Sequence, residues 1–185
     1  MAQADVHTAK PEDIAEIARI QVDTWRAAYT GILTDEVLRS LDPAELGEIW
    51  QDTVEHGDAT VYVATEGEWR VGFCAAGPAP ETEVADHEGL LPEDASTIGL
   101  IGTLLVEPRW GRRGHGGRLL ATAAQGLKQT GATRGMVWIP ENDGVSIAFY
   151  ERAGWERDGM VRTLDAGGRP LREIRLTGTL DFRLS

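Results

Sequence analysis

The chain has 185 residues, of which 42% are hydrophobic, enough to build one domain over residues 1–185 with its own core. Its 30 acidic residues outnumber the 18 basic ones and give a formal net charge of -12, which argues against a nucleic acid or an anionic membrane as partner and favours a cationic small molecule. One cysteine, Cys74, excludes an internal disulfide framework. The sequence shows no apolar run of the ~18 to 20 residues needed to cross a bilayer, and its first residues do not have the layout of a secretion signal. We therefore expect a cytoplasmic protein.

The first elements along the chain are a short strand and a helix. Residues 6–9 favour a strand, and Pro11 followed by two acidic residues suits the first turn of a helix. Apolar residues then recur at steps of three and four until Gly31 ends the pattern, which indicates one stripe that faces the core. The members of this stripe are Ile14, Ile17, Ala18, Trp25, Ala28 and Tyr29.

The next segment predicts more helix and then a β-hairpin. Residues 34–55 have a helical pattern that Asp42 and Pro43 interrupt. Residues 60–65 and 71–76 alternate well enough for two strands, and the sequence between them is typical of a turn.

The second half of the chain predicts further strands and helices. Residues 77–96 are rich in proline and acids and lack periodicity, so we expect a long connection. Residues 97–106 form an apolar run that is typical of a central strand with both faces covered. The remaining expected elements are a helix through Leu119, Leu120, Ala123, Ala124 and Leu127 that ends at Gly131, a strand at 136–139, a short helix at 146–152, and a hairpin of 155–163 and 171–176 around Gly167 and Gly168.

These elements predict an α/β (α+β) domain. We expect a mixed central sheet of about six to seven strands, flanked by helices. The sequence shows no internal repeat and no linker long enough to divide it into two domains.

The most informative stretch is residues 106–120, where a strand passes through a glycine-rich turn directly into an amphipathic helix. Glycines let the backbone approach a ligand closely, and the unpaired N–H groups and dipole of a helix start favour an anion. Arginines add positive charge and forked donors. The residues concerned are Gly114, Gly116, Gly117, Arg112, Arg113 and Arg118. They predict a pyrophosphate site; the alternative is a glycine-rich surface loop with solvated arginines.

Other known site motifs do not fit the sequence. A dinucleotide fingerprint needs a third glycine where Leu119 stands, and a P-loop needs Lys and then Ser or Thr where Gly117 and Arg118 stand. The four histidines lack metal-site spacing, and no Gly-x-Ser-x-Gly or Cys/His pairing is present.

Two motifs resemble the GNAT acetyltransferase superfamily. Its Val-x-Pro, Gln/Arg-x-x-Gly-x-Gly/Ala and Leu-Leu layout is matched by Val106, Pro108, Gly114, Gly116, Leu119 and Leu120. Residues 143–155 are similar to its Asn-x-x-Ala-x-x-Phe-Tyr-x-x-x-Gly-Phe signature. The chain departs from these patterns at Gly111, where Gln or Arg is usual, and at Asp143, which stands at the Asn position beside Asn142.

The resemblance implies an N-acetyltransferase that moves an acetyl group from acetyl-CoA, without a metal, to an amine that attacks the thioester directly. By the same resemblance Tyr150 either protonates the leaving sulfur or only hydrogen-bonds to it; the alternative is a core aromatic residue beside Phe149. The residues expected to bind the coenzyme are Leu104, Leu105, Val106, Arg112, Arg113, Gly114, His115, Gly116, Gly117, Arg118, Asn142, Asp143, Ser146 and Tyr150.

The acceptor is expected to be a small-molecule or peptide amine, whose ammonium must lose a proton before it attacks. Residues 97–106 contain no acid or histidine, so we expect the base in the long connection. The catalytic candidates there are Glu93 and His87, with Glu83, Glu88 and Asp94 as further candidates. The alternative is that this acidic segment is a solvated loop. Trp25 and Tyr29 either line the acceptor pocket or belong to the core. Homodimers are common in the superfamily. Two other functions stay open, a non-catalytic acyl-CoA sensor and a nucleotide-binding regulatory domain.

Overall fold

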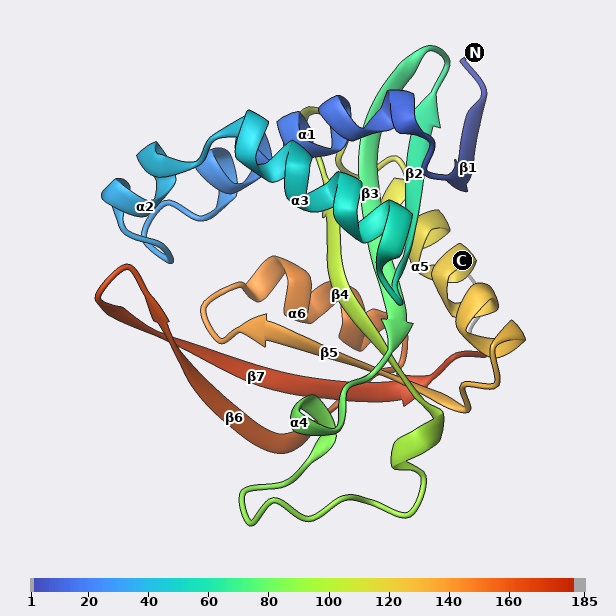
Figure 1. The fold of residues 1–185 in the computed structure, drawn as a ribbon, viewed down its shortest axis with the longest axis vertical. Coiled ribbons are helices and arrows are strands. Elements are labelled where there is room, and N and C mark those ends of the chain that lie inside the picture. Colours follow the sequence, from blue (N-terminus) through green and yellow to red (C-terminus); the bar gives the residue numbers. More distant parts are fainter. Residues whose placement is uncertain (1, 182–185) are drawn as a thin grey trace.

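The computed structural model describes residues 2–181, and within them seven strands form one mixed sheet (Figure 1). The strand order is β1-β2-β3-β4-β5-β7-β6. The strands are β1 (Ala4–Thr8), β2 (Thr60–Glu66), β3 (Trp69–Pro78), β4 (Ile98–Val106), β5 (Arg134–Pro140), β6 (Glu156–Ala166) and β7 (Arg169–Thr179). The only parallel pair in this described part is β4 with β5; all other neighbours are antiparallel. The predicted fold class is confirmed.

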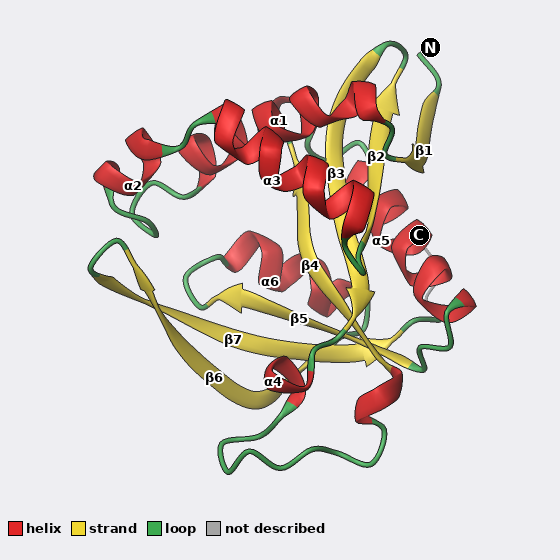
Figure 2. Ribbon diagram, in the orientation of Figure 1, coloured by secondary structure: helices red, strands yellow, loops and turns green. Residues whose placement is uncertain are grey.

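Helices cover both faces of the sheet (Figure 2). Within residues 2–181 they are α1 (Ile14–Ala28), α2 (Asp35–Ser40), α3 (Pro43–His56), α4 (Glu81–Val84), α5 (His115–Gln129) and α6 (Gly144–Arg152), with short 3-10 turns η1 (Pro11–Asp13), η2 (Ala95–Thr97) and η3 (Pro108–Trp110). None of the described helices is long and apolar enough to cross a membrane.

Two hydrophobic clusters fix these layers. On one face Ile17 and Ile20 of α1 and Trp50 of α3 pack against the sheet around Phe73. On the other face the apolar stripe of α5 and the buried side of α6 pack around Ile101. The glycine-rich turn joins β4 to α5, so its position is set by a central strand and by the larger of the two clusters.

The feature that shapes the candidate site is a fork between β4 and β5. Their parallel pairing begins at Ile98 and Arg134 and ends at Ile101 and Val137. In the pairing of β4 with β3 the register shifts at Gly102, which has no partner in β3. A β-bulge of this kind bends a strand, so the remainder of β4 turns away from β5 and leaves a gap between two sheet edges.

The structure corrects two details of the sequence-based expectations. The second half of β4 is not covered on both faces, since residues 103–106 are partly exposed beside the fork. In α1 the core stripe ends early, because Ala28 is exposed and Trp25 and Tyr29 are only half-buried; the predicted helices, hairpins and the end of α5 at Gly131 are otherwise confirmed to within a few residues.

Candidate active site

The glycine-rich turn presents a run of free backbone amides. Gly111 donates its N–H to the carbonyl of Pro108 at 3.1 Å, and the first bond of α5 runs from the N–H of Arg118 to the carbonyl of Gly114 at 3.0 Å. Between these two bonds, the amides of residues 112–117 find no acceptor within residues 2–181. Six successive donors at the start of a 15-residue helix are the kind of arrangement that binds anions, so the turn is a candidate anion site.

Two residues give the turn its shape. Gly114 has a φ of 82° and Arg112 a φ of 61°. The left-handed region suits glycine, but it costs an arginine on the order of 1 to 3 kcal/mol, and residues strained in this way are concentrated at ligand-binding loops.

The three arginines of the turn have different neighbours. Arg113 pairs with Glu66 at 2.9 Å and lies 5.0 Å from the centre of the Trp110 ring. Arg118 donates to the carbonyl of Arg113 at 3.1 Å. Arg112 is exposed and makes no ion pair with any residue of the described range 2–181. Arg112 and Arg118 therefore carry the charge that no carboxylate of the described chain neutralises.

His115 differs from the other members of the turn because its side chain points into the protein. Its ring is buried, with Nε2 2.8 Å from Oε2 of Glu66, while Nδ1 has no partner within residues 2–181. The bond to His115 and the nearby Arg113 guanidinium lower the pKa of Glu66, although burial opposes the shift. Only the backbone amide of His115 faces the anion site; its side chain anchors the turn to the end of β2.

Gly116 brings three elements together. A Cβ atom built on this glycine would lie 3.3 Å from Phe149 on α6 and 3.9 Å from Leu104 on β4. Such contacts are tight enough that a larger residue would displace its neighbours. The absent side chain therefore brings the start of α5 within van der Waals distance of β4 and of α6.

Tyr150 of α6 belongs to the hydrophobic cluster that also contains Ile101 of β4 and Val137 of β5. Its side chain is 4% exposed and its ring is 5.1 Å from those of Phe149 and Trp155. Burial raises the pKa of Tyr150 well above 10, and Cys74 and Tyr29 add to the shift. Its hydroxyl makes no hydrogen bond within residues 2–181 and is not among the fully buried unpaired atoms, so a protonated donor is available for a ligand.

Of the two neighbouring residues in the turn between β5 and α6, Asp143 faces inward and Asn142 lies on the surface. Asp143 is half-buried and caps α6, accepting from the backbone N–H of Ser146 at 3.1 Å and from its hydroxyl at 2.7 Å. Asn142 is exposed and makes no side-chain hydrogen bond in the described range. The hydroxyl of Tyr29, from the end of α1, donates to Asp143 at 3.3 Å, and Trp25 packs 5.8 Å from the Tyr29 ring.

A cleft of about 230 Å³ opens where β4 and β5 separate. Its walls come from five elements that are far apart in the sequence: Glu83, Leu100, Ile101, Gly102, Trp138, Arg162 and Glu173. Sequence reasoning did not find Trp138, Arg162 or Glu173. The only signal for Glu173 is an acid within a strand whose neighbours Ile174 and Leu176 are buried.

The two residues of the long connection that were expected to act as the base, His87 and Glu93, do not lie at this cleft. The segment from Ala85 to the start of β4 runs past the end of the sheet opposite the glycine-rich turn (Figure 1). Asp94 is held there by Arg134 at the beginning of β5, with bonds of 2.6 and 3.0 Å. His87 and Glu93 are exposed and line no part of the cleft. Of the acids considered in the connection, the structure brings only Glu83 to the fork.

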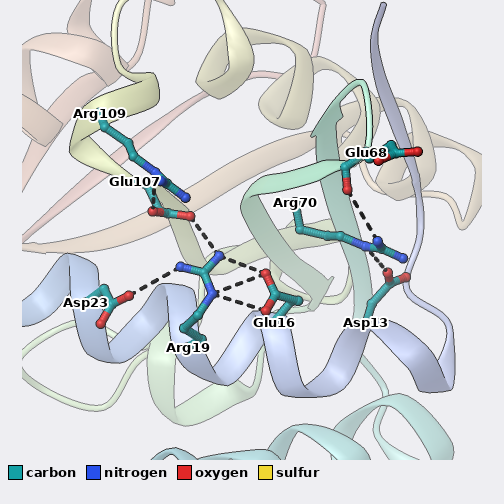
Figure 3. Close-up of polar contacts among 8 residues, drawn as sticks. All are labelled: Asp13, Glu16, Arg19, Asp23, Glu68, Arg70, Glu107 and Arg109. Atoms are coloured by element: carbon teal, nitrogen blue, oxygen red, sulfur yellow. Dashed lines mark hydrogen bonds and ion pairs between the residues drawn. The ribbon is translucent and has the colours of Figure 1, made fainter.

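An ion-pair network anchors the segment that leads from β4 into the glycine-rich turn (Figure 3). Glu107 directly follows β4 and is nearly buried; it accepts from Arg19 of α1 at 2.8 Å and from Arg109 at 3.0 Å. Arg19 also bonds Glu16 and Asp23 on its own helix. This network joins α1 to the segment that leads into the free amides. No group of three or more possible metal ligands occurs among residues 2–181.

The sequence is similar to known acetyltransferases. Residues 15–155 match the sequence model described as the acetyltransferase (GNAT) family. The chain is 35% identical over 172 residues to the protein of Bacillus subtilis (strain 168) named "Uncharacterized N-acetyltransferase YuaI", with 92% of this chain and 90% of that protein covered.

The fold is similar to solved structures. The PaiA N-acetyltransferase from Thermoplasma acidophilum, in complex with coenzyme A, has a TM-score of 0.70 at 15% identity, covering 96% of this chain and 99% of that chain. YncA from Salmonella typhimurium, with its cofactor acetyl-CoA, has a TM-score of 0.67 at 16% identity, covering 98% of this chain and 96% of that chain. At such identities these likenesses show a shared fold.

Proposed function

This chain belongs to the GNAT acetyltransferase family, and from that membership we propose how its residues divide the work of an N-acetyltransferase that uses acetyl-CoA. The proposal assigns the diphosphate of the coenzyme to the glycine-rich turn, the thioester to the fork, and the amine to the cleft beside it.

The single observation that carries the proposal is the run of six free amides at residues 112–117. Backbone N–H groups at a helix start bind phosphate groups well because both the donors and the helix dipole favour negative charge. Arg112 and Arg118 add charge that no described carboxylate neutralises. The close contact of Gly116 with Leu104 and Phe149 supports a path from the turn into the fork. The residues present therefore fit a diphosphate.

The fork suits the reacting end of the coenzyme, which supplies the acetyl thioester when bound. Residues 104–106 of β4 pair with β3 on one side only, so backbone groups on their other edge are available to the pantetheine arm and the carbonyl oxygen. Fixed donors to such an oxygen are typically worth ~3 to 4 kcal/mol of barrier. Tyr150 would hydrogen-bond the sulfur; its raised pKa favours this role over full transfer of its proton to a thiolate, whose thiol is more acidic.

The amine would enter from the side of α1, α2 and the β6–β7 hairpin. Tyr29 and the cleft residues lie there, and the net charge of -12 favours the approach of a cation. We assign Trp25 to packing against Tyr29 rather than to direct contact with the acceptor.

The experiment is release of free thiol from acetyl-CoA in the presence of a panel of amines: spermidine, kanamycin, lysine and a peptide with a free amino-terminal alanine. Thiol release that depends on one of these amines, with an acetylated product detected by mass spectrometry, is the expected result. Tight binding of acetyl-CoA without turnover of any amine would instead indicate a non-catalytic acyl-CoA sensor. A rise in melting temperature with ATP or NAD equal to that with coenzyme A would indicate a general nucleotide-binding domain.

A further inference from the structure

The amine must lose a proton before it attacks, and β4 supplies no residue to accept it. At pH 7 the pH is about 3.4 units below the pKa of a lysine-like ammonium, so only a small fraction of the amine is neutral. We propose that Glu173 of β7 is the catalytic base, which binds the protonated amine in the cleft at the fork and takes its proton. This inference rests on the proposed function, because it assigns a further role within the same site.

Glu173 is placed at the edge of the fork. It is the register partner of Pro140, the last residue of β5, beyond the point where β5 has separated from β4. The residue is 8% exposed. One carboxylate oxygen, Oε1, accepts from Nε of Arg162 at 2.8 Å. The other oxygen, Oε2, accepts no hydrogen bond within residues 2–181 and is not among the fully buried unpaired atoms, so it is open to the cleft whose wall Glu173 helps to form.

The Glu173 side chain is 11% exposed, and its free oxygen is open to the cleft rather than fully buried, where it can accept from a bound cation. Buried polar groups are nearly always hydrogen-bonded, and exceptions in a native structure tend to mark functional groups. Trp138 gives a second, independent sign in the same cleft, because its indole N–H is fully buried and has no acceptor within the described residues. The residues of the cleft wall therefore include a free acceptor and, in Trp138, a buried donor without a partner in the described chain.

Arg162 is the positioning residue for this carboxylate. It bonds Glu173 on one side and Glu83 on the other, and its guanidinium lies 4.4 Å from the centre of the Trp138 ring. Two carboxylates share one arginine, so the cluster keeps one negative charge for an incoming ammonium. Glu83 is the more exposed of the two, with a side-chain exposure of 27% against 11% for Glu173, which makes Glu173 the stronger candidate.

The other charged and titratable groups around Glu173 are accounted for. Arg175, on the same face of β7, is held by Asp158 at 2.6 Å and by the backbone carbonyls of residues 83–85. Tyr29, which follows α1, donates to Asp143. Burial, and then the charges of Asp143 and Glu173, raise the pKa of Tyr29. Neither Tyr29 nor Tyr150 loses its proton near neutral pH, so neither competes with Glu173 for the role of base.

An N–H bond of the ammonium breaks and its proton goes to Oε2 of Glu173. The freed lone pair forms the new N–C bond to the acetyl carbonyl carbon, the C–S bond breaks, and the sulfur leaves as thiolate with a hydrogen bond from Tyr150. The proton on Glu173 then passes to solvent or to the thiolate. The attacking nitrogen loses its second N–H proton as the amide forms, and of the two protons released one goes to the thiolate and the other to solvent. The products are an N-acetyl amine, coenzyme A and one proton, and no other reactant is needed.

The test uses Glu173→Gln, which keeps an oxygen for Arg162 but cannot accept a proton from an ammonium. The substrate is the panel amine with the fastest thiol release. We expect kcat/KM at pH 7 to fall about 100- to 1,000-fold. The defect should shrink about tenfold for each pH unit from 7 to 9, because the variant depends on neutral amine already present in solution. Affinity for acetyl-CoA, measured by calorimetry, should change less than about twofold.

The control is Glu156→Gln, which makes the same change at an exposed position of β6 and should keep full activity. Glu173→Asp carries the test if Glu173→Gln does not fold: a loss of tenfold or more with the same pH trend is expected. Three results would overturn the assignment, namely activity of Glu173→Gln above a third of wild type at pH 7, an equal defect at pH 7 and pH 9, or a rise in KM alone. Loss of acetyl-CoA binding in the wild type would instead overturn the proposed function.

Discussion

The hydroxyl of Tyr29 lies 3.3 Å from Oδ2 of Asp143, although 114 residues separate them in the sequence. Tyr29 follows the last residue of α1, and Asp143 caps the start of α6. Burial and the neighbouring carboxylates raise the pKa of Tyr29 well above its ordinary value, so the phenol remains a donor at physiological pH. The contact joins the helix expected to line the acceptor side with the turn expected to lie beside the coenzyme.

Substitutions at this contact should separate the contribution of the Tyr29 hydrogen bond to stability from that of the Asp143 helix cap. Tyr29→Phe removes one long hydrogen bond and should lower the free energy of unfolding by no more than about 1 kcal/mol. Asp143→Ala should cost about 1 to 2 kcal/mol, because it also removes the cap of α6. Urea denaturation of the two single variants and the double variant measures the coupling. If Tyr29→Phe lowers the free energy of unfolding more than Asp143→Ala does, the helix cap is not the larger contribution and the prediction is wrong.

Tyr150→Phe should impair the chemical step and leave coenzyme binding intact. A hydrogen bond to a charged group contributes about 1.5 to 3 kcal/mol, so kcat should fall about 10- to 100-fold if Tyr150 stabilises the departing sulfur. The fold should be retained, since the buried ring is kept. Steady-state thiol release and calorimetry with coenzyme A give the two quantities. An unchanged kcat would return Tyr150 to the role of a core aromatic residue.

The tip of the β6–β7 hairpin contacts α2, and a pair of adjacent glycines can test what this contact does. Gly167 and Gly168 both have positive φ, but a Cβ on Gly167 would lie 2.3 Å from Val37 of α2, whereas a Cβ on Gly168 meets nothing within 4 Å. Alanine at either position carries the same backbone penalty, roughly 1 to 2 kcal/mol. Gly167→Ala should cost about 1 to 3 kcal/mol more, because the hairpin must move away from α2.

Because the hairpin and α2 border the proposed amine entrance, Gly167→Ala should also raise the KM for the amine. The affinity for coenzyme A should not change. Gly168→Ala serves as the matched control for strain alone, and thermal melts with amine titrations report both effects. Equal behaviour of the two variants would mean that the contact with Val37 is unimportant.

Asp13 should give the protein a stability that is lost at low pH. The carboxylate is fully buried and accepts from the N–H of Lys10 at 3.0 Å and from Arg70 at 3.0 Å, with Nε2 of His7 at 2.9 Å (Figure 3 shows the arginine). Burial alone would raise its pKa, but these hydrogen bonds outweigh burial and the pKa lies below the ordinary value of 3.8. The folded state therefore binds a proton less readily than the unfolded state.

A depressed pKa contributes stability above the unfolded value and loses it as pH falls through the folded value. Asp13→Asn should cost about 2 kcal/mol at pH 7, less than the ~3 to 5 kcal/mol typical of a fully buried pair because its partners are partly exposed. The difference from wild type should shrink below about pH 4. Asp5→Asn, at an exposed position on β1, is the control and should show no such trend. A difference that grows on acidification would have the wrong sign.

The parts of the candidate site that are local in the chain are those that the sequence could predict. The glycine-rich turn, its place between β4 and α5, and Tyr150 on α6 all lie within motifs of consecutive residues, so their patterns could be read directly. The same reading could not give side-chain direction: the burial of His115 depends on Glu66, which comes from β2. It also could not give the gap between β4 and β5, because the bulge at Gly102 arises only in the pairing with β3.

The cleft could not be predicted because its residues meet only in the folded chain. Glu83, Arg162 and Glu173 come from α4, β6 and β7, and each is an unremarkable charged residue in its own segment. The acidic composition of residues 77–96 predicts a base in the long connection. Its residues His87 and Glu93 lie elsewhere because Arg134 holds Asp94 at the start of β5, which fixes the connection at the other end of the sheet.

Calorimetric titration of coenzyme A into wild type, Gly116→Glu and Gly47→Glu tests the central claim, that the amides of residues 112–117 bind the coenzyme's diphosphate. A glutamate at position 116 puts a side chain against Phe149 and a negative charge at the anion site, whereas a Cβ at position 47 meets nothing within 4 Å. We predict that wild type and Gly47→Glu bind coenzyme A equally and that Gly116→Glu, folded by its melting curve, binds at least about 100-fold more weakly. No heat of binding with wild type, or equal affinity in Gly116→Glu, would contradict the claim.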